Sequence, residues 1–89
     1  MLYTVYAIAS IGRKYVYIGM TDNLERRMKQ HQNGLNRTTK PYRPFEQIYT
    51  ETFSTRWEAR EREKKLKTGS EREKLYLLRE KKIDKSTRA

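Results

Sequence analysis

The chain has 89 residues, which is enough for one small domain and too few for a second hydrophobic core. Lys and Arg number 21 against 11 Asp and Glu, so the net charge of +10 favours an anionic partner such as a nucleic acid. The absence of cysteine excludes disulfides and thiolate metal sites, and the shortness of the apolar runs predicts no membrane span and a cytoplasmic location.

Two segments near the start of the chain, residues 1–10 and 14–19, are rich in aromatic and β-branched side chains and flank a turn with Gly12. This pattern predicts an antiparallel hairpin. With the loop at residues 10–13, Ala9 pairs with Lys14 and Tyr6 pairs with Tyr17, so the two phenols lie side by side on one face. The residues predicted to form the core on the opposite face are Val5, Ala7, Val16 and Ile18.

Residues 24–32 are predicted to form a helix that begins after the capping candidates of residues 21–23 and ends near Gly34. The stripe at helical spacing that faces the sheet consists of Leu24, Arg27, Met28 and His31. Arg27 and His31 are polar, and polar groups on an inward face cost free energy unless they have partners. Departures of this kind are expected where function is located.

The second half predicts a loop over residues 35–44, a strand over residues 45–53 and two helices. Thr55 with Glu58 forms a capping box that begins a helix ending at about Lys67, and Ser70 with Glu73 forms another that begins a helix ending near Lys82. The order β-β-α-β-α-α predicts a small mixed α/β (α+β) domain over residues 1–83, with a frayed tail over residues 84–89.

Several short segments, in this order, resemble the GIY-YIG nuclease superfamily. They are Thr4-Val5-Tyr6, Tyr17-Ile18-Gly19, Arg27 in the first helix, and Glu58-Ala59 followed by Glu63. The similarity covers residue 3 to about residue 80 and is greatest to the small single-domain group related to the nuclease domain of bacterial excision repair (UvrC-like). The resemblance implies a three-stranded antiparallel sheet flanked by helices, and a DNA endonuclease that uses Mg²⁺ or Mn²⁺ in repair or recombination.

By position, the resemblance makes Tyr6 the general base and Tyr17 the residue that positions water or phosphate. It makes Arg27 the catalytic arginine, His31 a supporting catalytic residue and Glu63 the single metal ligand. These types suit phosphodiester hydrolysis, because a guanidinium matches phosphate oxygens and Mg²⁺ often takes only one or two carboxylates. The basic residues expected to contact the DNA backbone with little sequence specificity are Arg26, Lys29, Arg37, Lys40 and Arg43.

Other interpretations of the same residues remain open. Paired tyrosines are common in sheet packing, Arg27 resembles other surface cations, and His31 suits the negative end of a helix dipole. Glu63 has an i,i+4 partner in Lys67, while Glu58 is explained by its capping role. Glu61 points about 200° away from Glu63 around the helix, so the two do not face one site.

Two departures from the superfamily pattern favour other functions. Met20 stands where excision-repair members have a lysine, and no clear counterpart exists for the asparagine that many members have near the end of the domain. The alternatives are a catalytically inactive nucleic-acid-binding module with the same fold and a small subunit of a protein complex. In the enzyme interpretation, a partner protein is a possible source of targeting.

Overall fold

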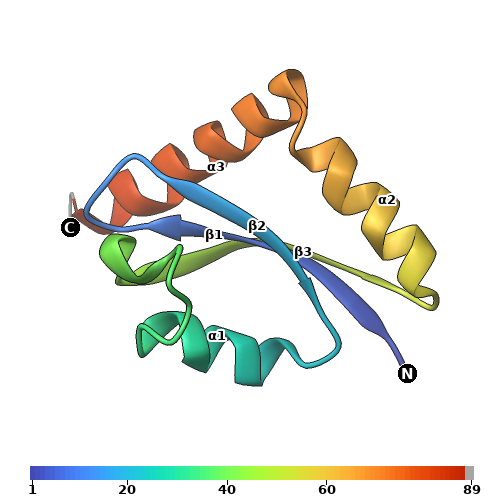
Figure 1. Ribbon diagram of the computed structural model, residues 1–89. Coiled ribbons are helices and arrows are strands. Elements are labelled where there is room, and N and C mark those ends of the chain that lie inside the picture. The colour runs from blue at the N-terminus through green and yellow to red at the C-terminus, as the bar shows by residue number, and fades with distance from the viewer. Residues whose placement is uncertain (88–89) are drawn as a thin grey trace.

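The computed structural model describes residues 1–87, with side chains to residue 83. Its elements are β1 (Tyr3–Ser10), β2 (Val16–Thr21), α1 (Leu24–Gln32), the short 3₁₀ helix η1 (Lys40–Tyr42), β3 (Phe45–Phe53), α2 (Arg56–Leu66) and α3 (Gly69–Thr87). The three strands form one antiparallel sheet in the order β2-β1-β3, with α1 on one face and α2 and α3 on the other (Figure 1). The predicted fold class and element order are therefore confirmed.

The hairpin between β1 and β2 has a different register from the predicted one. Tyr6 lies opposite Gly19, and Tyr17 lies opposite Ile8, so the prediction that Tyr6 pairs with Tyr17 is wrong. The turn is wider than expected, because the Ser10 amide donates to the Tyr15 carbonyl at 2.9 Å. The shift is by an even number of residues, so every side chain keeps its predicted face.

Strand β3 contains an irregularity that the sequence did not reveal. Ala7 of β1 pairs with Tyr49, but the next residue, Ile8, pairs with Gln47. Ile48 is therefore the extra residue of a β-bulge. The bulge allows the consecutive side chains of Ile48 and Tyr49 to pack on the same face of the sheet, against α2 and α3.

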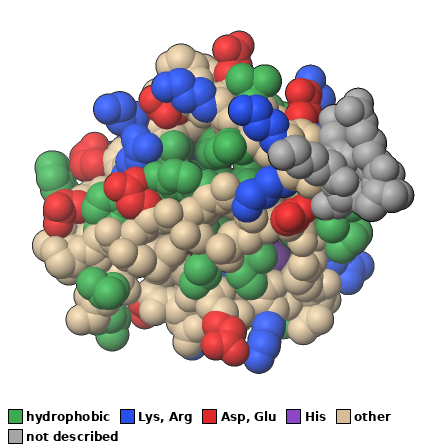
Figure 2. Space-filling view, turned by 180° about the vertical axis from the view of Figure 1, so that it is seen from behind, with side chains coloured by type: hydrophobic (Ala, Val, Ile, Leu, Met, Phe, Trp, Pro, Cys, Tyr) green, Lys and Arg blue, Asp and Glu red, His purple; other side chains and the backbone are tan. Residues whose placement is uncertain are grey.

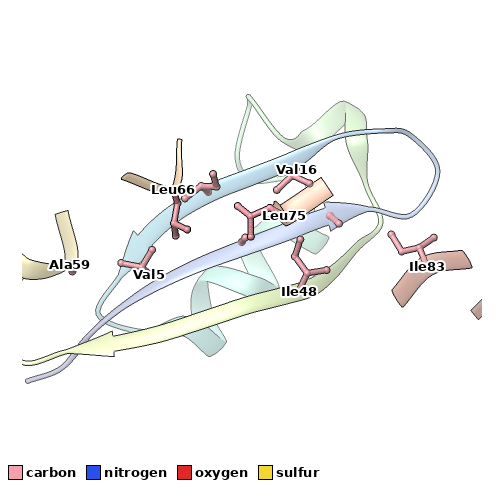
Figure 3. Packing of buried hydrophobic residues seen from close by; sticks show 10 residues of the cluster. Val5, Val16, Ile48, Ala59, Leu66, Leu75 and Ile83 are labelled. Atoms are coloured by element: carbon pink, nitrogen blue, oxygen red, sulfur yellow. The ribbon is translucent and has the colours of Figure 1, made fainter. Parts of the chain in front are cut away.

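The apolar core lies between the sheet and the pair α2 and α3 (Figure 3). The predicted core residues of the hairpin, Val5, Ala7, Val16 and Ile18, are all buried there. The other buried members are Ala9, Ile48, Ala59, Leu66, Leu75 and Ile83. Burial of this apolar surface is the main force that holds the two helices on the sheet.

Two of the three helices begin at the capping residue that the sequence predicts. Asn23 caps α1 by accepting from the Arg26 amide at 3.0 Å, and Thr55 caps α2 by accepting from the Glu58 amide at 3.2 Å. The third signal was wrong, because α3 begins at Gly69 and Ser70 lies inside the helix instead of capping it. Helix α3 also continues through residues 84–87, where a frayed tail was predicted, while residues 88–89 lie outside the described part of the chain.

Within residues 1–87, no helix combines the length and the apolar character needed to cross a lipid bilayer.

Candidate active site

The site is built around Tyr6, which lies on the central strand and points toward α1. Its ring lies against Gly19 of β2, where a Cβ atom would stand 2.6 Å from the Tyr6 hydroxyl oxygen. Any larger residue at position 19 would therefore displace the ring. The glycine explains how a tyrosine with only 1% of its surface exposed fits between a strand and a helix.

Helix α1 contributes His31 to the same place. The His31 side chain is fully buried, and its Nε2 atom is 2.8 Å from the Tyr6 hydroxyl oxygen. The ring of Tyr17 completes the cluster, with its centroid 5.1 Å from that of His31 and 6.3 Å from that of Tyr6. The structure thus brings together three of the predicted residues from β1, β2 and α1. Burial excludes the alternative of His31 as a solvated cation at the helix end.

The C-terminal end of α1 is held by two local devices. Gly34 has φ +74, in the left-handed region that favours glycine, and the Leu35 amide donates to the Gln30 carbonyl at 2.9 Å, which closes a Schellman motif. The side-chain amide of Gln32 donates to the Phe45 carbonyl at 2.8 Å and accepts from the Phe45 amide at 2.9 Å. These contacts fix the last turn of α1, and with it His31, against the start of β3.

Thr39 is a member of this cluster that the sequence analysis missed. It is fully buried, and its hydroxyl oxygen is 2.9 Å from Nδ1 of His31, so both ring nitrogens of His31 have a partner. Thr39 lies in the loop predicted over residues 35–44. A loop carries no periodic pattern from which a buried threonine could be recognised.

Burial and nearby charges shift the pKa values of Tyr6 and His31. Burial raises the pKa of the Tyr6 hydroxyl, the neighbouring Tyr17 and the charge of Glu63 raise it further, and the charge of Arg27 lowers it. Burial, with a smaller contribution from Arg27, lowers the pKa of His31. Both groups are therefore neutral at pH 7, so the hydrogen bond between them joins two uncharged side chains.

Glu63 belongs to α2, which packs on the opposite face of the sheet and contacts both β1 and β2. Its side chain is mostly buried, with 17% exposed, and it forms an ion pair with Lys67 at 3.5 Å. The charge of Glu63 raises the pKa of the Tyr6 hydroxyl, by less than burial, Tyr17 or Arg27 change it. Glu58 instead accepts from the Thr55 hydroxyl at 2.8 Å.

Glu63 is the residue predicted to hold a divalent ion, and it comes from α2, on the face of the sheet opposite α1. Among the described residues, no group of three or more His, Cys, Asp or Glu side chains lies close enough to hold a metal ion by itself. A single mostly buried carboxylate fits an ion that keeps most of its waters, as Mg²⁺ commonly does. It does not fit a closed structural metal site.

The five basic residues predicted to contact nucleic acid are all exposed. On α1, Arg26 pairs with Asp22 at 3.6 Å and Lys29 pairs with Glu25 at 3.6 Å. In the loop, Nε of Arg43 donates to the Lys40 carbonyl at 3.1 Å. Figure 2 shows Lys and Arg side chains interspersed with Asp and Glu on the face that it presents, so the positive charge there does not form one continuous patch.

The model of the GIY-YIG catalytic domain matches residues 2–85 of the chain. An UPF0213 protein of Staphylococcus saprophyticus is 39% identical over 66 residues, which cover 73% of this chain and 80% of that protein. An UPF0213 protein of Clostridium perfringens is 38% identical over 69 residues, covering 76% and 74%. UPF0213 protein YazA of Bacillus subtilis is 37% identical over 70 residues, covering 78% and 71%. No solved structure gives a significant match.

Proposed function

Because the chain belongs to the GIY-YIG catalytic domain family, a nuclease family, we propose that it is a metal-dependent DNA endonuclease that hydrolyses phosphodiester bonds. The observation that carries the proposal is the convergence on the Tyr6 hydroxyl. His31 bonds to this hydroxyl at 2.8 Å, the ring centroid of Tyr17 is 6.3 Å from that of Tyr6, and Arg27 lies one helical turn before His31 on α1. Ordinary sheet packing does not require a buried imidazole that is hydrogen-bonded to a buried tyrosine hydroxyl.

Each residue has a role that follows from its chemistry. Arg27 binds a non-bridging phosphate oxygen, because its planar guanidinium presents paired donors. Tyr6 orients and deprotonates the attacking water, and Tyr17 holds the water or the phosphate in line. Glu63 holds the divalent ion, Mg²⁺ or Mn²⁺, which when bound stabilises negative charge on the scissile phosphate and its leaving oxygen.

The DNA backbone lies along α1 and the loop that follows it. Arg26 and Lys29 on α1, with Arg37, Lys40 and Arg43 in the following loop, contact phosphates and supply affinity without reading base sequence. Selection of a nicked, branched or single-stranded substrate then depends on DNA shape or on a targeting protein. A role in repair or recombination, as in UvrC-like nucleases, is the corresponding biological proposal.

The test is nicking of supercoiled plasmid and of branched DNA by the purified protein with Mg²⁺ or Mn²⁺, followed by addition of EDTA. We expect that the wild type nicks DNA and that EDTA stops the reaction. The nicking rate should be lower by about 10²-fold or more in Tyr17→Phe and Glu63→Gln. Glu61→Gln is the matched control, because this exposed residue lies on the same helix and points elsewhere. It should nick like the wild type.

Two results would contradict the proposal. Salt-dependent DNA binding by the wild type without nicking on any substrate would favour the non-catalytic binding module. Nicking that is equal in Glu63→Gln and Glu61→Gln would remove Glu63 from the metal site.

A further inference from the structure

A continuous chain of polar groups, three of them buried side chains, runs from the candidate active site into the loop after α1. It consists of the Tyr6 hydroxyl, the His31 ring, the Thr39 hydroxyl and the main-chain carbonyl of Asn36. The successive distances are 2.8 Å from Tyr6 Oη to His31 Nε2, 2.9 Å from His31 Nδ1 to Thr39 Oγ1, and 3.5 Å from Thr39 Oγ1 to the Asn36 carbonyl oxygen. The three side chains are at most 1% exposed, so water does not replace these bonds.

The directions of the hydrogen bonds follow from counting donors. If Tyr6 donates to Nε2, then Nδ1–H donates to Thr39 and the Thr39 hydroxyl donates to the Asn36 carbonyl, so every hydrogen of the chain has an acceptor. In the opposite direction the Tyr6 hydrogen has no acceptor among the described residues. Buried hydroxyl hydrogens are costly when unpaired, so the first arrangement is favoured.

The position of Thr39 is set by a turn that Asn36 organises. The Asn36 side-chain oxygen accepts from the amides of Thr38 at 3.0 Å and Thr39 at 3.2 Å. The Asn36 carbonyl also accepts from the Lys40 amide at 2.9 Å. This Asx-type turn holds the Thr39 hydroxyl against the imidazole and uses no residue of the sheet.

We infer that Thr39 is a positioning residue. It accepts a hydrogen bond from Nδ1–H of His31 and thereby keeps Nε2 unprotonated, so that Nε2 can take the proton of Tyr6 during hydrolysis. The inference rests on the proposed function. The attacking water gives its proton to Tyr6 while the Tyr6 proton moves to Nε2. The electron pair of the broken water O–H bond remains on the oxygen and forms the bond to phosphorus as the bond to the leaving oxygen breaks. After the cleavage the Nε2 proton returns to the Tyr6 oxygen as Tyr6 gives its own proton to water, and solvent protonates the leaving alkoxide.

This arrangement overcomes an obstacle to catalysis by Tyr6. Burial disfavours a free phenolate at this position, so a tyrosine acting alone would be a poor base at neutral pH. A concerted transfer to a neutral imidazole avoids the phenolate, as in other nucleophile–base–orienter arrangements. The groups that face His31 are Tyr6 from β1, Tyr17 from β2, Arg27 from its own helix and Thr39 from the loop, with the uncharged Phe45 from β3 at its edge.

The test compares Thr39→Val, which keeps the shape and removes the hydroxyl, with Thr39→Ser, which keeps the hydroxyl. The chain has one histidine, so its ¹⁵N resonances report the tautomer without ambiguity in the protein free of metal and DNA. We expect the Nδ1–H form in the wild type and in Thr39→Ser, and a shift toward Nε2–H in Thr39→Val. We also expect kcat for nicking to fall about 10- to 100-fold in Thr39→Val, with DNA affinity unchanged and rescue by Thr39→Ser.

The two readouts separate this inference from the proposed function. A wild type in the Nε2–H form, or a Thr39→Val variant with unchanged tautomer and kcat, overturns the positioning role of Thr39. A wild type that never nicks DNA overturns the proposed function and, with it, the proton transfer, while the tautomer still decides whether Thr39 orients His31. Thermal unfolding of both variants identifies any loss of activity that comes from unfolding.

Discussion

The two faces of the sheet bury different kinds of side chain from the same strand. In β1, Val5, Ala7 and Ala9 point into an apolar core beneath α2 and α3, whereas Tyr6 points toward α1 and bonds to a buried histidine. The apolar face is held by non-directional burial, which tolerates small shifts, but the α1 face depends on hydrogen bonds with fixed geometry. Stability is therefore expected to depend mainly on the apolar face, and function on the α1 face together with Glu63 of α2.

The largest effect on stability is expected from the apolar face. Leu75 of α3 is 2% exposed, and Leu75→Ala should lower the free energy of unfolding by about 2–5 kcal/mol because it leaves a cavity. Urea denaturation measures this loss. Leu77→Ala is the matched control, because Leu77 is 58% exposed and should change stability by less than about 0.5 kcal/mol. The nicking rate per folded molecule should stay unchanged in Leu75→Ala, and a large loss would show that the two faces are coupled.

A somewhat smaller effect is expected where the α1 face is tightly packed. In Gly19→Ala the new methyl group would stand 2.6 Å from the Tyr6 hydroxyl oxygen, so the ring must move away from His31. We expect a loss of about 1–3 kcal/mol in the free energy of unfolding, together with reduced nicking. Gly12→Ala is the control, because a Cβ at Gly12 meets no atom within 4 Å. Equal behaviour of the two variants would show that the ring has space to adjust.

This contrast also explains which features could be predicted from sequence. Alternation of apolar residues predicted both faces of the hairpin correctly, because the actual register differs from the predicted one by two residues, which keeps every side chain on its face. The predicted register was wrong, because a single glycine, Gly12, does not fix the length of the turn. A two-residue Asn-Gly turn would have fixed it. Thr39 could not be found either, since its partner His31 lies on another element and only the folded loop brings them together.

The lowered pKa of His31 predicts a pH dependence of stability. Its pKa in the folded protein lies below the ordinary value of 6.5, so the unfolded chain binds the proton more readily. Stability contributed by neutral His31 is fully present above pH 6.5 and is lost as pH falls from there toward the folded pKa, with a slope of at most about 1.4 kcal/mol per pH unit. Urea denaturation between pH 5 and 7.5 measures the slope. His31→Gln should remove it, and a slope that persists in this variant would assign it to another group.

The smallest effect on stability is expected from the exposed cations. Their position on one side of the sheet or the other is expected to matter for DNA binding. Lys29 of α1 is 73% exposed and pairs with Glu25 at the surface, so Lys29→Gln should change the free energy of unfolding by less than about 0.5 kcal/mol. If Lys29 contacts a phosphate, the same change should lower the slope of log affinity against log salt by about one for DNA binding. Lys81→Gln, at an exposed position of α3 beyond the opposite face, should leave the slope unchanged. Equal losses in the two variants would mean that the charge of the whole chain, and not the α1 face, binds DNA.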